Sequence, residues 1–174
     1  MRIKVVVVAL AVAVLQAATP EPAEEYRVKG AYLLNFAKFV EWPDSAFKGP
    51  ADPIAVCVLG ANPFSPALDA AAHSVLVEKH PVVVKQIPEP LQARQCHIVF
   101  VSTAERKHVR ALLQAVQGGN VLTVGESDGF VADGGVIELS VEGGKVRMEI
   151  NTDGAKKAGL RISAKLLSLA QTTR

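Results

Sequence analysis

The chain has 174 residues, of which 49% are apolar and 21% charged, as in a single globular domain with a substantial core. The formal net charge is only +2, aromatic residues make up 5%, and no basic stripe is present. These values exclude the cationic footprint that a nucleic-acid-binding protein needs.

Residues 1–18 have the layout of a secretory signal peptide. Arg2 and Lys4 carry positive charges, Val5–Leu15 is wholly apolar, and small residues follow. The apolar run is shorter than the about 20 residues that span a bilayer, and no later run reaches that length. We therefore expect cleavage and export, with a mature domain over residues 19–174 and no stable membrane insertion. A core helix or a retained membrane anchor is the alternative.

The first element expected in the mature chain is a helix from about Glu25 to Val40. Its apolar positions fall at three- and four-residue spacing, which predicts one buried face. That face comprises Val28, Ala31, Tyr32, Asn35, Phe36, Phe39 and Val40. Pro43 biases the residue before it away from helical geometry, so the helix should end near Glu41.

Three apolar runs without alternation predict strands that are buried on both faces, as in the centre of a parallel sheet. They are residues 54–60, 82–87 and 97–102. Between the first two runs, Asn62-Pro63 or Ser65-Pro66 can cap and start a short helix that ends near Ala72.

After the third strand, Ser102 and Glu105 match the capping-box pattern, and a helical face follows over residues 109–116 until two glycines end it. Residues 121–124 predict a further buried strand, and residues 75–77 fit a short edge strand. Strands and helices therefore alternate. This predicts an α/β fold, a single domain with a mostly parallel central sheet, flanking helices and right-handed crossovers.

The last third of the chain predicts a C-terminal β-hairpin, formed by residues 136–141, a glycine-containing turn and residues 146–151. On its second strand the apolar residues alternate with Arg147, Glu149 and Asn151, so one side of the hairpin should face solvent.

Two short helical segments are expected after the hairpin. Residues 155–158 form one turn or more, and Ser163 can cap a final helix that carries Leu166, Leu167 and Ala170. No internal repeat or linker divides the mature chain.

Two cysteines in an exported chain favour one disulfide over two free thiols. Cys57 lies in the first buried strand and Cys96 begins the third, so the two sulfurs can meet if these strands are neighbours. Together with His97 they could instead hold a metal, but three ligands without CxxC or HxxxH spacing are a weak signal. We predict the disulfide, with neither a metal nor a cofactor.

Gly125–Gly129 matches the G-x-S-x-G pattern of a hydrolase nucleophile elbow that follows a strand. The match fails on context, because the segment leads into another strand and not into a helix. All four histidines also precede Ser127, whereas that fold places its histidine after the serine. We interpret the segment as a polar loop. No other catalytic set stands out, so a binding or regulatory module is favoured over an enzyme.

Several segments of the chain resemble the YfiR/HmsC family in the same order. The most specific is the run GAYLLNFAKFVEWP, residues 30–43. Shorter similarities cover essentially the whole mature chain, at residues 57–64, 96–102, 121–124, 146–151 and 158–167.

The resemblance implies a periplasmic regulatory protein of Gram-negative bacteria that is not an enzyme. The best-understood kind of member binds the periplasmic sensor domain of an inner-membrane diguanylate cyclase and holds it inactive. Cyclic di-GMP and biofilm formation then stay low. The family also has a disulfide similar to the Cys57–Cys96 pair. A second cysteine pair that some members carry near the hairpin is missing here.

We therefore expect a repressor of such a cyclase that acts by protein–protein interaction, with a homodimer left open. The alternative is a periplasmic binding or accessory module of another sensor system, a hybrid histidine kinase or an outer-membrane receptor. A small-molecule pocket at the carboxyl ends of strands 54–60 and 97–102 would fit that alternative. Arg147, Glu149 and Asn151 are the expected rim of the partner-binding surface, unless they only solvate the sheet.

Overall fold

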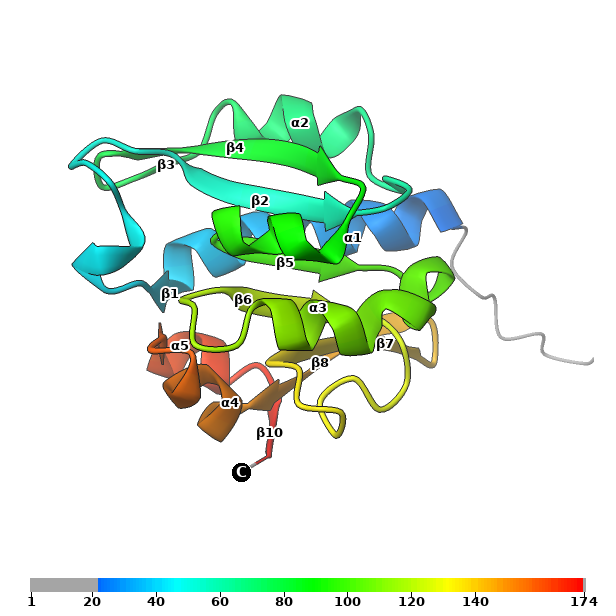
Figure 1. Cartoon of the computed structure of the whole chain (residues 1–174). Coiled ribbons are helices and arrows are strands. Elements are labelled where there is room, and N and C mark those ends of the chain that lie inside the picture. Colours follow the sequence, from blue (N-terminus) through cyan, green and yellow to red (C-terminus); the bar gives the residue numbers. More distant parts are fainter. Residues whose placement is uncertain (1–21, 174) are drawn as a thin grey trace, which may run out of the picture.

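The computed structural model describes residues 22–173, so the expected signal peptide over residues 1–18 lies outside the described part. The central sheet has eight strands in the order β10-β8-β7-β6-β5-β2-β4-β3 (Figure 1). Its middle is parallel and consists of β4 (His80–Ile87), β2 (Ile54–Leu59), β5 (Ile98–Val101), β6 (Leu122–Gly125) and β7 (Ile137–Glu142).

This order confirms the expected α/β fold with a mostly parallel sheet. The chain passes from β2 to β4 on one side, crosses back to β5 on the other side, and then adds β6 and β7 outward. Such a doubly wound order places helices on both faces of the sheet. In Figure 1, α1 (Pro22–Phe39) and α2 (Ala67–Ala72) lie behind the sheet, and η2 (Pro90–Gln95) and α3 (Val109–Ala115) lie in front.

The burial of β2 shows why its sequence is an unbroken apolar run. Val56 and Val58 belong to the core under α1 and α2, whereas Ala55, Cys57 and Leu59 belong to the core under α3. Because successive strand residues point to opposite faces, a strand between two helical layers must be apolar at every position.

The helix expected near residues 25–40 is confirmed as α1, but its predicted buried face is partly wrong. Leu33, Phe36 and Ala37 are fully buried, whereas Ala31 and Asn35 are exposed. The predicted and the observed buried residues both follow the helical period. The helix is rotated so that leucine is buried in place of asparagine, because this removes more apolar surface from water. Among residues 22–173, no helix combines the length and the apolar content needed to cross a bilayer.

The predicted hairpin is confirmed as β7 and β8 (Lys145–Asn151), which pair antiparallel. Met148 and Ile150 on β8 are buried in the core under α1, so the expected alternation along this strand is confirmed. Two short helices follow, α4 (Thr152–Lys157) and α5 (Ala164–Leu167).

The end of the chain differs from the helix expected to reach Ala170. Ser163 does cap α5, because its hydroxyl accepts a hydrogen bond from the Leu166 N–H at 3.3 Å. After Leu167 the chain turns and forms β10 (Gln171–Thr173), which runs parallel to β8. The outer edge of β8 would otherwise leave its backbone groups without partners, and β10 provides them.

Two further pairings complete the fold. The sequence did not predict a second small sheet, in which β1 (Val40–Glu41) pairs antiparallel with β9 (Arg161–Ile162). This sheet fixes the end of α1 to the C-terminal region. The expected edge strand near residues 75–77 is confirmed as β3 (Leu76–Val77), which pairs with the start of β4.

The capping box expected after the third strand is wrong. Ser102 makes no capping hydrogen bond through its side chain, and the segment that follows is a 3₁₀-helix, η3 (Thr103–His108). The carboxylate that should complete the box belongs to Glu105, and it binds His108 Nδ1 at 2.8 Å. Because that partner lies one turn further on, Glu105 does not reach back to the start of the helix.

Candidate functional site

Cys57 and Cys96 form the predicted disulfide, and both residues are buried. β2 and β5 are direct neighbours, which brings the two Cα atoms to 6.0 Å from each other. The bond joins positions 39 residues apart, for which the chain-entropy model gives about 4 kcal/mol of stabilisation. Both sulfurs are therefore committed to each other and not to a metal. Within residues 22–173, no group of three or more potential metal ligands gathers.

A buried polar cluster lies where β5 and β6 end. Glu126 directly follows β6, and its carboxylate accepts hydrogen bonds from the Tyr26 hydroxyl and the Thr103 N–H, both at 2.9 Å. Lys29 on α1 forms ion pairs with Glu126 and Glu25. The cluster therefore fixes the first turns of α1 to the carboxyl edge of the sheet.

The polar groups of the cluster bond to one another. Burial raises the pKa of Tyr26 far above its ordinary value, and the hydrogen bond to Glu126 raises it further. The phenol therefore stays protonated and donates to the carboxylate. Since Lys29 also pairs with two carboxylates, the donors and acceptors of the cluster satisfy one another.

A stack of rings lies at the opposite edge of the sheet, where β2 and β5 begin. The Phe47 ring is sandwiched between His80 and His97, at centroid distances of 4.1 and 4.7 Å. His97 Nδ1 accepts from the Ala55 N–H at 3.1 Å, so its Nε2 carries the hydrogen and donates to Ala46 O at 3.2 Å. Burial lowers the pKa of His97, so the ring is held neutral as a packed core histidine.

Gly125 ends β6, and residues 126–129 form a loop, as the context predicted. Ser127 Oγ is buried and has no hydrogen-bond partner within the described residues, so no histidine activates it. Gly125 and, further along the loop, Gly135 have a steric role, because a Cβ at these positions would lie 2.5 or 2.1 Å from the ring of Phe130. The loop therefore folds around this aromatic ring, and a nucleophile elbow is not formed.

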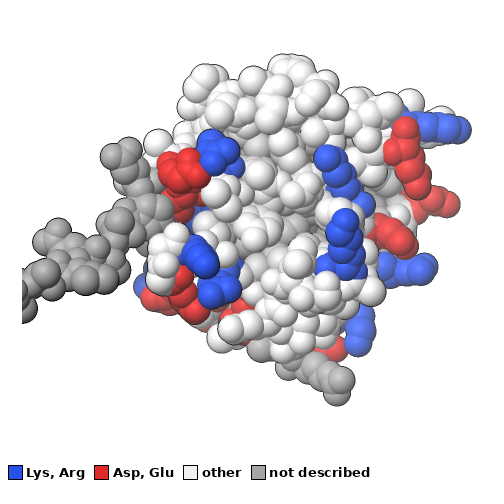
Figure 2. All heavy atoms as spheres, turned by 180° about the vertical axis from the view of Figure 1, so that it is seen from behind, with Lys and Arg blue, Asp and Glu red and all other residues white. Residues whose placement is uncertain are grey.

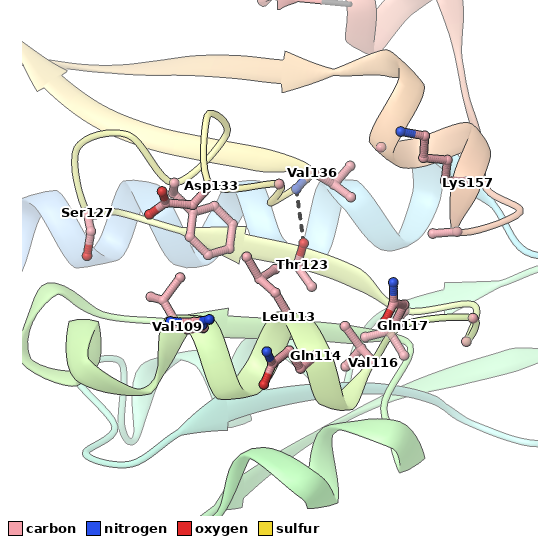
Figure 3. Close-up of a pocket in the computed structure, with 18 of the residues that line it drawn as sticks. Val109, Leu113, Gln114, Val116, Gln117, Thr123, Ser127, Asp133, Val136 and Lys157 are labelled. Carbon is pink, nitrogen blue, oxygen red and sulfur yellow. Dashed lines mark hydrogen bonds between the residues drawn. The ribbon is translucent and has the colours of Figure 1, made fainter.

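A groove of about 750 Å³ runs beside α3 (Figure 3). One wall is α3, and the other is the loop between β6 and β7 together with α4. In Figure 3, Val109 and Leu113 of α3 face Thr123 and Val136 across the groove. Thr123 Oγ1 accepts a hydrogen bond from the Val136 N–H at 3.0 Å, which ties that loop to β6. The apolar lining consists of Val109, Leu113, Val116, Val121, Phe130 and Val136.

The rim of the groove is strongly basic. Four exposed cations line it against one acidic residue, Asp133, and within residues 22–173 none of the four forms an ion pair. The cations are Arg106, Lys107, Arg110 and Lys157. On the opposite face of the molecule, acidic and basic side chains instead interleave around a largely uncharged centre (Figure 2). Positive charge is therefore concentrated around this groove.

A small-molecule pocket at the carboxyl ends of β2 and β5 would fit the alternative function, but a side chain fills the space there. Glu105 of η3 lies over Gly60, so close that a Cβ there would be 2.2 Å from its carboxylate. Gln86 Nε2 also donates to Gly60 O at 2.6 Å. The large groove therefore lies further along the sheet, beside α3 and above β6.

All three residues expected at the rim of a partner surface lie on β8, but their surroundings differ. Arg147 is 57% exposed, and Glu149 is half-buried. Asn151 instead caps α4, since it accepts from the Gly154 N–H at 2.7 Å and donates to Gly135 O at 3.3 Å. Arg147 and Glu149 therefore present polar groups at the surface, while Asn151 holds the local fold.

Neither the buried ion pair nor the basic groove was predicted from the sequence. A signal for the pair was available, because Lys29 interrupts the apolar part of α1 and follows Glu25 by one helical turn. For the groove, the sequence shows three of the four cations within residues 106–110, but it does not show the walls. Its lining comes from η3, α3, a loop and α4, which only the folded chain brings together.

A family model described as YfiR/HmsC-like matches residues 26–171. No curated protein matches the chain. Among solved structures, a conserved domain protein from Vibrio cholerae is similar at 12% identity and a TM-score of 0.51. An ABC domain in complex with L-Trp from Streptococcus pneumoniae is similar at 11% identity and a TM-score of 0.56.

The matched regions cover 70% and 83% of this chain, but only 55% and 60% of the two solved chains. This chain therefore spans less than two thirds of either structure. At such low identity, the similarity shows a shared fold and nothing about ligands or partners.

Proposed function

Because the chain belongs to the YfiR/HmsC-like family, we propose that it is a periplasmic regulatory protein that represses an inner-membrane diguanylate cyclase. It binds the periplasmic sensor domain of the cyclase and thereby lowers cyclic di-GMP and biofilm formation. The family match over residues 26–171 is the observation that carries the proposal. The signal-peptide pattern of residues 1–18 supports it, because such a partner domain is reached only after export.

A binding mechanism suits the groups that the described residues offer. Ser127 has no histidine partner, and the buried groups around Glu126 satisfy one another. A protein that acts without catalysis changes its partner by binding one state more tightly than another. To shift a cyclase from a 99:1 to a 1:99 ratio of active to inactive molecules, the repressor must bind the inactive state about 5.5 kcal/mol more tightly than the active one.

For the rim of the partner surface we propose Arg147 and Glu149 on β8, with Asn151 supporting them through its cap of α4. Interfaces have an apolar centre and a polar rim, and charged rim residues contribute mainly to orientation and to association rate. A charge reversal at such a position should weaken binding without unfolding the domain.

The test is a deletion strain that expresses the partner cyclase. Cyclic di-GMP should rise in this strain and return to its original level when the wild-type gene is restored. Complementation with Glu149→Arg should restore repression only in part, while Glu78→Arg, an exposed control in the turn before β4, should restore it fully. Unchanged cyclic di-GMP in the deletion strain would reject the repressor function.

A second candidate is a binding or accessory module of another membrane sensor system, such as a hybrid histidine kinase or an outer-membrane receptor. The groove favours this candidate, because its volume of about 750 Å³ lies within the range of small-molecule sites. The neighbouring reading frame distinguishes the two candidates. A membrane protein with a cyclase domain supports repression, and a sensor kinase supports the accessory module.

A further inference from the structure

We propose that the groove beside α3 is the docking site for an acidic amphipathic segment of the protein partner, in which apolar side chains are flanked by carboxylates. The inference rests on the proposed function, since that function supplies a protein partner. It adds a second contact surface to the rim on β8 and states the chemistry of the segment that this surface would bind.

The rim of the groove carries a local excess of positive charge. Four cations against Asp133 leave three uncompensated positive charges around one groove. A mature chain without Arg2 and Lys4 has 17 basic and 17 acidic residues, so this excess is local and not a property of the whole chain. Unpaired exposed cations around one concave surface attract an anionic partner and steer its approach.

The cations lie at both ends of the groove. Figure 3 shows Ser127 and Lys157 at opposite ends, and α3 begins at the Ser127 end with Val109. Arg106 and Arg110 therefore lie toward that end, across the length of the groove from Lys157. The apolar lining of the groove lies between the two cationic ends.

The length of the α3 wall indicates how long the bound segment is. α3 has seven residues, which at 1.5 Å per residue makes it roughly 10 Å long. An extended segment rises about 3.3 Å per residue, so roughly three residues span this length. A segment with a carboxylate on each side of about three residues that include apolar side chains therefore matches both cationic ends and the apolar lining.

A second copy of this chain fits the groove less well. In a two-fold dimer through this surface, each copy would present the same patch, so Arg106 and Arg110 would face another cationic rim. Such a juxtaposition of like charges costs affinity. An acidic segment of another protein would not meet that repulsion. The charge pattern therefore favours a separate partner protein over a second copy of this chain.

The experiment measures binding of the purified full mature chain to the periplasmic domain of the cyclase that is its proposed partner. The test variant is Arg110→Glu combined with Lys157→Glu. The matched control is Lys38→Glu on α1 combined with Lys79→Glu in the turn before β4. It changes the net charge equally at exposed positions that do not line the groove. Circular dichroism and urea unfolding establish that all the chains fold alike. Sedimentation of each chain alone reports its oligomeric state.

We expect the groove variant to bind at least about tenfold more weakly, while the control binds within about twofold of the wild type. Wild-type affinity should also fall with added salt, and the groove variant should lose most of this dependence. Equal affinities of the groove variant and the control would overturn the docking site and leave the proposed function intact. If the groove variant instead dissociates a dimer of this chain, the occupant is a second copy and the proposal is wrong.

A wild-type chain that neither binds nor inhibits the cyclase would overturn the proposed function, and the partner assignment would fall with it. The two failures are distinguishable, because the first appears only in the variants and the second already appears in the wild type.

Discussion

Lys29 on α1 and Glu126 at the end of β6 form an ion pair although 97 residues separate them in the sequence. Their side chains are only 3% and 4% exposed, so both charges are removed from water. A charge buried in this way is costly unless its partner is present. The pair therefore commits α1 to a single position against the carboxyl edge of the sheet.

We expect Lys29→Met to lower the free energy of unfolding by about 3–5 kcal/mol, because it leaves Glu126 buried without its cation. Combining it with Glu126→Gln should cost less than the sum of the two single changes, since the amide oxygen can still accept from Tyr26 and Thr103. Urea unfolding measures all three variants. Lys156→Met, which removes an exposed pair with Asp153, is the control and should change stability by less than about 1 kcal/mol.

Removing the disulfide should lower stability without changing the fold. Cys57→Ala combined with Cys96→Ala is expected to cost about 4 kcal/mol, because the unfolded chain regains the freedom that the cross-link removes. The wild-type chain unfolded in the presence of a reductant should approach the value of the variant. Equal unfolding midpoints for the oxidised wild type and the variant would contradict this prediction.

Stability should fall as the pH drops through the range in which His97 titrates. Burial lowers the pKa of His97 in the folded chain below the ordinary value of 6.5, so the unfolded chain binds this proton more readily. The free energy of unfolding therefore decreases from about pH 6.5 down to the folded pKa and then levels off. Above pH 6.5 the ring is neutral in both states and contributes no pH dependence.

The measurement is urea unfolding as a function of pH for the wild type and for His97→Gln. The amide of glutamine does not titrate in this range, so the variant should show a flatter profile below pH 6.5. His73→Gln, at the exposed C-terminal end of α2, serves as the matched control for replacing a histidine outside this ring stack. A His97→Gln profile as steep as that of the wild type would refute the assignment.

Gly135→Ala should destabilise the loop before β7. The added Cβ would lie 2.1 Å from the ring of Phe130, which must then leave its packed position. We expect a loss of about 1–3 kcal/mol, as for other overpacked sites. Gly49→Ala is a suitable control, because its Cβ would approach its nearest neighbour, on Asp52, at an ordinary 3.5 Å. A near-neutral effect at both positions would mean that the ring moves aside without cost.

The sequence by itself determined the elements that depend on local pattern. The unbroken run of β2 predicted a strand between two layers, and the alternation on β8 predicted a hairpin with one apolar side. The disulfide followed from the export signal and from the expectation that the strands of Cys57 and Cys96 are neighbours. Each of these signals arises from the side-chain period of a strand or from covalent chemistry, which do not depend on distant parts of the chain.

Only the tertiary structure decided how these elements meet. α1 could rotate either of two helical stripes toward the sheet, and the stripe with Leu33 and Phe36 was selected because it packs against strands far along the chain. The pairing of β10 with β8, the Lys29–Glu126 pair and the basic groove likewise join segments that are remote in sequence. Their free energy arises from packing and desolvation between distant surfaces, and the period of a single segment carries no information about such contacts.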